Sequence, residues 1–128
     1  MIYLDTSVAL AQLLAEDRCP PEEFWQQEMV TSRLFEYELW NAIHRRRLEK
    51  SHGDAVRRIV ESMAIAELSR EVLQRAKEPF PSPVRTLDAL HLATLLFLQD
   101  QGLEMELASY DQRLGAAAKA LHIPQVDC

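Results

Sequence analysis

Cysteines and long apolar runs are scarce in this 128-residue sequence. The two cysteines, Cys19 and Cys128, are far apart with no spacing typical of a metal site, so we expect reduced thiols in a cytoplasmic protein. The longest apolar run, residues 87–98, contains Asp88 and His91 and is too short to cross a bilayer. No basic region followed by an apolar run begins the sequence. We therefore expect no signal peptide and no membrane partner.

Basic residues are also fewer than acidic residues. The sequence has 14 lysines and arginines against 20 aspartates and glutamates, which gives a net charge of −6. Proteins that bind nucleic acid through its phosphates alone are usually basic. If this protein acts on nucleic acid, its carboxylates need to be offset, and a bound divalent cation would do that.

The motifs of several enzyme classes are absent. The sequence has no P-loop, no glycine-rich dinucleotide motif and no serine nucleophile elbow. The histidines show no zinc-binding spacing; they are His44, His52, His91 and His122. His91 lies one helical turn after Asp88. We interpret it as a packed helix histidine, and a supporting contact near Asp88 is the alternative.

The sequence has only three glycines and many helix-forming residues, so we expect more helix than strand. Short apolar segments predict strands at residues 1–4, 29–31, 64–68 and 104–110, and an edge strand at 124–126. Helices are predicted at residues 8–15, 21–28, 34–50, 54–63, 69–77, 86–101 and 111–121. We expect Gly53 to separate two helices and Ser69 to cap the helix that begins there. We expect Thr86 to cap the most apolar helix and Gly102 to end it. This alternation predicts a single α/β domain, residues 1–128, with a parallel sheet between helices.

Three aspartates stand where strands end or helices begin. Asp5 follows the first predicted strand, and Asp111 follows the strand at 104–110. Ligands of open α/β sheets bind outside the carboxyl ends of the strands, so both side chains should point into one crevice. Asp88 lies in the first turn of an apolar helix, whose N-terminus stabilises a carboxylate. Each could serve only as a helix cap, but carboxylates gathered together predict a site for magnesium or manganese.

A fourth acid should come from the helix predicted at residues 34–50. Glu36 and Glu38 are two residues apart, so only one of them can face the crevice. Glu38 shares its side of the helix with Leu34 and Ala42, and Glu36 shares its side with Leu39. Because both sides are apolar, periodicity does not choose between the two glutamates.

The basic residues concentrate in one part of the sequence. They are His44, Arg45, Arg46, Arg47, Lys50, Arg57 and Arg58. A solvated helix face is one interpretation, and a surface for phosphates or for an acidic partner segment is the other. Arg85 is a further candidate for a phosphate contact. Trp25, Tyr37 and Trp40 are candidates for a dimer interface or for ordinary burial.

Four segments form a pattern that runs through the chain. Apolar residues 2–4 precede Asp5-Thr6-Ser7, and Thr31-Ser32-Arg33-Leu34 is followed by Glu38, six residues after Ser32. The third segment is residues 85–93 around Asp88, and the fourth is Ser109-Tyr110-Asp111 with the residues that follow. In this order the segments resemble the PIN-domain family, and within it the VapC toxins of toxin–antitoxin pairs. His122 is a departure, because the family commonly has glycine there.

The resemblance implies a PIN-like three-layer fold, with a short central parallel sheet flanked by helices on both faces. It implies a metal-dependent endoribonuclease in which Asp5, Glu38, Asp88 and Asp111 hold Mg²⁺ or Mn²⁺, and it thereby selects Glu38 over Glu36. Thr6 and Ser109 match supporting hydroxyl positions. The implied partners are an RNA substrate, a small VapB-like antitoxin and a second copy of the chain in a homodimer.

Three other interpretations are weighed against this one. A HAD-like phosphohydrolase also begins with an aspartate at a strand end, but it requires a second aspartate two residues later, where this sequence has Ser7. A non-catalytic PIN-like binding module is favoured if the site cannot hold metal. A helical interaction protein would make the four matched segments a coincidence.

Overall fold

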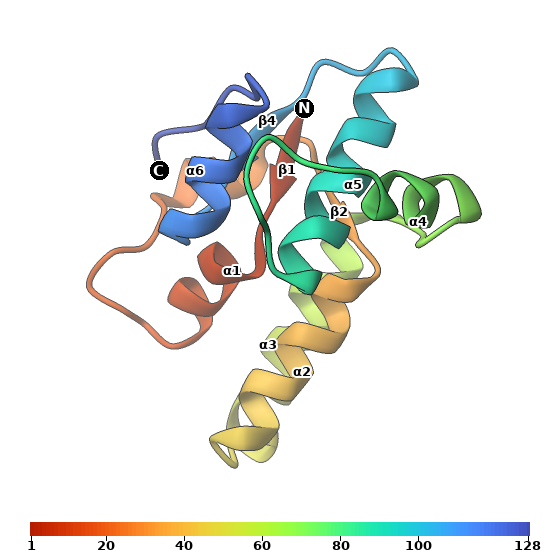
Figure 1. Ribbon diagram of the computed structural model, residues 1–128. Coiled ribbons are helices and arrows are strands. Elements are labelled where there is room, and N and C mark those ends of the chain that lie inside the picture. The colour runs from red at the N-terminus through yellow and green to blue at the C-terminus, as the bar shows by residue number, and fades with distance from the viewer.

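The computed structural model describes all residues from 1 to 128 and contains one parallel four-stranded sheet (Figure 1). The strands are β1 (Ile2–Leu4), β2 (Met29–Ser32), β3 (Ala64–Ala66) and β4 (Glu106–Ala108), in the spatial order β3-β2-β1-β4. β1 pairs with β2 on one side and with β4 on the other. The chain therefore changes direction across the sheet between β1 and β4, which is where α/β folds place their ligands.

Six α-helices and one 3₁₀-helix surround the sheet. They are α1 (Thr6–Leu13), η1 (Glu22–Gln26), α2 (Leu34–Arg45), α3 (Glu49–Ser62), α4 (Arg70–Lys77), α5 (Thr86–Asp100) and α6 (Gln112–Ala120). Ser69 caps α4 through a 3.2 Å hydrogen bond from the Val72 amide to its hydroxyl, and Gly102 follows α5 with a φ of 92°. Both features agree with the sequence prediction.

The alternating side chains of β1 divide the core into two clusters, one on each face of the sheet. Ile2 and Leu4 pack with buried residues of α1, α2 and α3, whereas Tyr3 packs with buried residues of α5 and α6. Neighbouring residues of a strand point to opposite faces, so this division follows from the strand geometry. The predicted fold class, a parallel sheet with helices on both faces, is confirmed.

The prediction that Gly53 separates two helices is wrong. Gly53 lies buried inside α3, and the chain instead reverses after α2 at Arg47, whose φ is 55°. A Cβ added at Gly53 would lie 3.5 Å from the Trp40 ring of α2. This is an ordinary van der Waals distance, so Gly53 lies beside the Trp40 ring with room for a methyl group.

Three other local predictions differ from the structure. Residues 22–26 form a short 3₁₀-helix, since Pro21 offers no side-chain cap to start a longer one. Arg85, and not Thr86, is the residue before α5, and no side chain caps that helix. The segment around Gln125 makes a single bridge to Leu107 of β4, so the edge strand predicted at 124–126 is reduced to that bridge. No helix is long and apolar enough to span a bilayer.

A carboxylate cleft as the candidate active site

A cleft of about 370 Å³ opens at the carboxyl ends of β1 and β4. Its lining comes from the end of β1 and from α1, α2, α5 and the start of α6, which are distant in sequence. All four acids singled out from the sequence line it: Asp5, Glu38, Asp88 and Asp111. Glu36 does not line the cleft and instead pairs with Arg33 at 3.4 Å.

Asp5 is held in place through one of its two carboxylate oxygens. Its Oδ2 accepts hydrogen bonds from the Ser109 hydroxyl at 2.8 Å, the Ser7 hydroxyl at 2.6 Å and the Ser7 amide at 3.4 Å. The Ser7 hydroxyl in turn accepts from the Tyr110 amide at 2.9 Å. Asp5 is only 6% exposed, and its Oδ1 has no protein partner. The side chain is therefore fixed with one oxygen left free.

Glu38 is fixed in the same manner. Its Oε1 accepts from the Thr6 hydroxyl at 3.0 Å and lies 2.5 Å from Nε2 of His91. The other imidazole nitrogen, Nδ1, lies 2.7 Å from the Tyr3 hydroxyl. A chain of side chains thus runs from the core through His91 to Glu38, whose Oε2 has no protein partner.

His91 has a larger part in the site than its sequence position indicates. It is 2% exposed, so it is a packed helix histidine as predicted, and it also bonds Glu38. Burial alone would lower the pKa of His91, but the hydrogen bond and the charge of Glu38 outweigh burial and raise it. The only sequence signal for this contact is the spacing of three residues from Asp88.

Asp88 and Asp111 are less constrained. Oδ1 of Asp111 caps α6 by accepting from the Arg113 and Leu114 amides at 2.9 and 3.1 Å. Asp88 accepts no hydrogen bond from the protein. Its pKa is raised, first by burial and then by the negative charges of Asp111 and Asp5. The cleft therefore holds more negative charge than its own side chains neutralise.

The donor set fits a hard divalent cation in its chemistry. Each of the four carboxylates has at least one oxygen without a protein partner, and Mg²⁺ and Mn²⁺ prefer oxygen ligands. As they stand, no three acidic, histidine or cysteine side chains are arranged to hold one ion. Asp111 caps its own helix through Oδ1 and Glu38 bonds Thr6 and His91 through Oε1, so each has only its other oxygen free for such a site.

The sequence matches the family described as PIN domain over residues 2–120. Two solved structures share the fold. A toxin–antitoxin complex from Klebsiella pneumoniae matches with a TM-score of 0.66 at 15% identity, covering 99% of this chain and 97% of that one. VapBC-1 from nontypeable Haemophilus influenzae matches with a TM-score of 0.64 at 15% identity, covering 99% and 98%.

Two proteins of Mycobacterium tuberculosis are similar in sequence. Ribonuclease VapC35 is 31% identical over 132 residues, covering 98% of this chain and 96% of the relative. Ribonuclease VapC46 is 31% identical over 126 residues, covering 94% and 92%. With the family match over residues 2–120, these similarities show that the chain belongs to the PIN-domain family, among its VapC-type members.

Proposed function

We propose that the chain is a metal-dependent endoribonuclease that hydrolyses RNA phosphodiester bonds as the toxin of a toxin–antitoxin pair. The observation that carries the proposal is the convergence of Asp5, Glu38, Asp88 and Asp111 on one cleft, in a chain whose relatives are named ribonucleases. These four side chains are the proposed ligands of Mg²⁺ or Mn²⁺. Thr6 and Ser109 are the proposed supporting residues, because each donates a hydrogen bond to one of those carboxylates.

The residues of the cleft have two kinds of role: some orient the carboxylates, and one accepts a proton. A bound divalent cation supplies positive charge for the scissile phosphate and makes a water more acidic. Ser7 and Ser109 hold Asp5, and Thr6 and His91 hold Glu38, so each carboxylate is bound to the protein through one oxygen and keeps the other without a protein partner. Asp88 is the proposed proton acceptor, since it lines the cleft and neither of its oxygens accepts a hydrogen bond from the protein. No protein nucleophile is required.

The proposed partners follow from the same assignment. RNA is the substrate, and a small VapB-like antitoxin is the inhibitor, as the names of the related toxin–antitoxin complexes support. We further propose that residues 1–128 act as one PIN-like domain, that two copies form a homodimer, and that the protein works in the cytoplasm. Cys19 and Cys128 are both unpaired, which suits a reducing compartment.

Of the three alternatives from the sequence, two are set aside and one remains. A helical interaction protein is set aside because the chain contains a four-stranded parallel sheet and matches the PIN-domain family. A HAD-like phosphohydrolase is set aside because the chain belongs to the PIN-domain family. In the structure, moreover, Ser7 bonds Asp5 and is no second acid of the site. A non-catalytic PIN-like binding module is the second candidate function. The observation in its favour is that no three side chains are yet arranged around one ion.

The test is cleavage of a structured RNA pool by the purified protein with manganese and with EDTA. Asp5→Asn removes the charge of a buried ligand, and Glu36→Gln is the matched control, since Glu36 lies outside the cleft on the same helix as Glu38. We expect cleavage with manganese by the wild type and by the control, and none with EDTA or with Asp5→Asn. Calorimetric titration with manganese measures binding separately. A wild type that neither binds manganese nor cleaves RNA would favour the binding module.

A further inference from the structure

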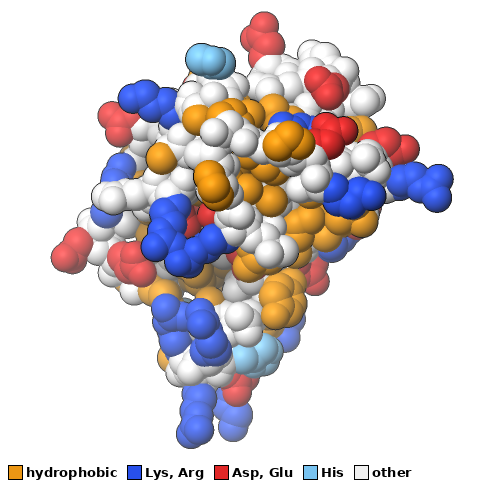
Figure 2. Space-filling model, in the orientation of Figure 1, with side chains coloured by type: hydrophobic (Ala, Val, Ile, Leu, Met, Phe, Trp, Pro, Cys, Tyr) orange, Lys and Arg blue, Asp and Glu red, His pale blue; other side chains and the backbone are white.

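The cations of this acidic protein concentrate at the end of the hairpin formed by α2 and α3. Residues 44–50 carry a net charge of +3, in a chain whose total is −6. The four basic side chains there are all exposed, and none forms an ion pair: Arg45, Arg46, Arg47 and Lys50. We call these four residues the basic tip. Figure 2 shows Lys and Arg side chains gathered at this end of the molecule.

The hairpin that carries the basic tip projects from the body of the protein and is internally braced (Figure 1). Trp40 of α2 packs against Gly53 of α3 and stacks on His44, with the ring centroids 5.6 Å apart. The Arg57 guanidinium lies over the Trp40 ring at 5.2 Å. These contacts hold the basic tip at a set position relative to the cleft. From Glu38 to Arg45 the helix rises by about 10 Å.

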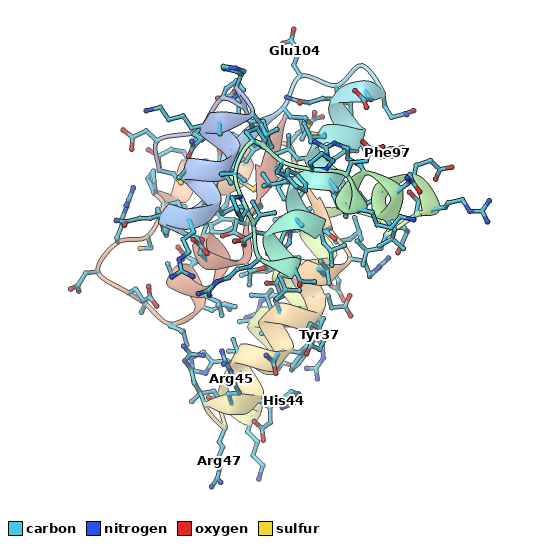
Figure 3. The ribbon with its side chains drawn as sticks, viewed as in Figure 1. Tyr37, His44, Arg45, Arg47, Phe97 and Glu104 are labelled. Atoms are coloured by element: carbon cyan, nitrogen blue, oxygen red, sulfur yellow. The ribbon has the colours of Figure 1, made fainter.

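The face of α2 between the cleft and the basic tip combines an aromatic ring with a cation. Tyr37, Asn41 and Arg45 are four residues apart, so they lie along one face of the helix, and all three line the cleft. The Tyr37 side chain is 62% exposed. Figure 3 shows Tyr37, Arg45 and Arg47 at successive levels along the hairpin. An exposed aromatic ring beside cations is the pattern by which proteins bind single-stranded nucleic acid.

A second basic region lies on another side of the cleft. A hollow of about 470 Å³ is lined by Arg85 and Arg113, and it shares Asp88 with the carboxylate cleft. Neither arginine forms an ion pair. The carboxylates are thus flanked by unpaired cations of α2 and by unpaired cations beside α5 and α6.

We propose that one unpaired RNA strand crosses the carboxylate cleft, with its phosphates held by Arg85 and Arg113 at one end and by the basic tip at the other, and with one base stacked on Tyr37. This inference rests on the proposed function, which supplies RNA as the substrate. An unpaired strand is favoured over a duplex because stacking on a side chain requires a base that has left the helix. It is favoured over an acidic peptide because a peptide's carboxylates would use the arginines but leave Tyr37 without a stacking partner.

The test measures binding and not cleavage, so it uses the Asp5→Asn protein at a fixed magnesium concentration. The probe is a short fluorescent oligouridine, and its anisotropy is followed over a series of salt concentrations. The salt slope for single strands is about 0.7 per phosphate contact, so removing two contacts lowers it by about 1.4 and weakens binding about 25-fold at about 0.1 M salt. We expect this result for Arg45→Gln with Arg47→Gln, and again for Arg85→Gln with Arg113→Gln.

Two further variants serve as comparisons. One tests whether any loss of positive charge weakens RNA binding, and the other tests the contribution of base stacking. Arg70→Gln with Lys77→Gln makes the same change of net charge in α4, which lines neither the cleft nor the hollow, and should leave the slope unchanged. Tyr37→Leu should weaken binding at least about fivefold with an unaltered slope. Circular dichroism checks that each variant is folded. A duplex of the same length should bind without any loss in Tyr37→Leu.

The outcomes distinguish this inference from the proposed function. If the wild type cleaves RNA but the arginine variants keep the slope of the α4 control, the strand path is wrong and the nuclease assignment stands. If the salt slope of binding falls as expected in the arginine variants but the wild type does not cleave RNA, the strand path is supported and the proposed nuclease activity is wrong. If oligouridine binds none of these proteins, the strand path is wrong. It is also wrong if the arginine variants still bind oligouridine normally and lose only the binding of a poly-glutamate peptide.

Discussion

Replacement of Tyr3 by phenylalanine should destabilise the protein while leaving its packing intact. The Tyr3 hydroxyl lies 2.7 Å from Nδ1 of His91, and the two residues are 0% and 2% exposed. Phenylalanine keeps the ring in the core but removes the one partner of that nitrogen. No water can reach it in compensation, because both side chains are buried.

The expected cost is that of leaving one buried polar atom without a hydrogen bond, about 1–3 kcal/mol. This is a sizeable part of the roughly 5–15 kcal/mol that stabilises a typical domain. For a chain of this length, 1 kcal/mol changes the Tm by roughly 3–5 °C, so the Tm should fall by roughly 3–15 °C. The stabilisation from burying the aromatic ring should change little, since tyrosine and phenylalanine bury the same apolar ring surface.

Urea unfolding followed by circular dichroism measures this change as a shift in midpoint at constant m-value. Tyr37→Phe is the matched control, because its hydroxyl is on a side chain that is 62% exposed, and it should change the free energy of unfolding by less than about 0.5 kcal/mol. Tyr3→Phe introduced into His91→Leu should cost much less than in the wild type. Equal costs in the two backgrounds, or a cost in the wild type as small as that of the control, would show that the hydrogen bond between Tyr3 and His91 does not stabilise the fold.

Three other substitutions test separate features. Ser109→Ala removes the 2.8 Å donor to Asp5 and should lower RNA cleavage by about 10–100-fold, measured as initial rates. Gly53→Ala should raise the free energy of unfolding by about 0.5–1 kcal/mol in urea, because the added Cβ meets Trp40 at an ordinary 3.5 Å and alanine favours helix; a loss of stability would contradict this packing. His122→Gly should raise the Tm, since His122 has a φ of 59° that glycine adopts without strain; an unchanged or lower Tm would show that its side chain contributes more than the strain costs.

The fold class and the position of the cleft can be predicted from the sequence, because both depend on which residues directly follow one another along the chain. Apolar residues 2–4 are short enough to read as a strand, and Asp5 directly after them must lie at the strand's carboxyl end. The helix caps at Ser69 and Asp111 are likewise local, since each side chain bonds an amide two or three residues away.

The parts that the sequence does not reveal depend on contacts between distant residues. His91 meets Tyr3, 88 positions away, and Glu38, 53 positions away, and nothing in the helix pattern specifies either partner. Periodicity leaves Glu36 and Glu38 equivalent because α2 packs on more than one side. Gly53 is misread as a break because α3 continues through it, packed against Trp40 of α2, which is a contact between helices that the local sequence does not reveal.

The hydrogen bond from Ser109 to Asp5 joins residues 104 positions apart, and the bond from His91 to Glu38 joins the helices of the sheet's two faces. A nascent chain therefore contains Asp5 and its neighbour Ser7 early, but Ser109, the second hydroxyl that holds Asp5, is added 104 residues later. Fragments and partly folded chains carry the same carboxylates without their alignment. The arrangement of the cleft carboxylates therefore depends on nearly all of residues 5–111, because its two long-range hydrogen bonds form only when those distant segments have folded together.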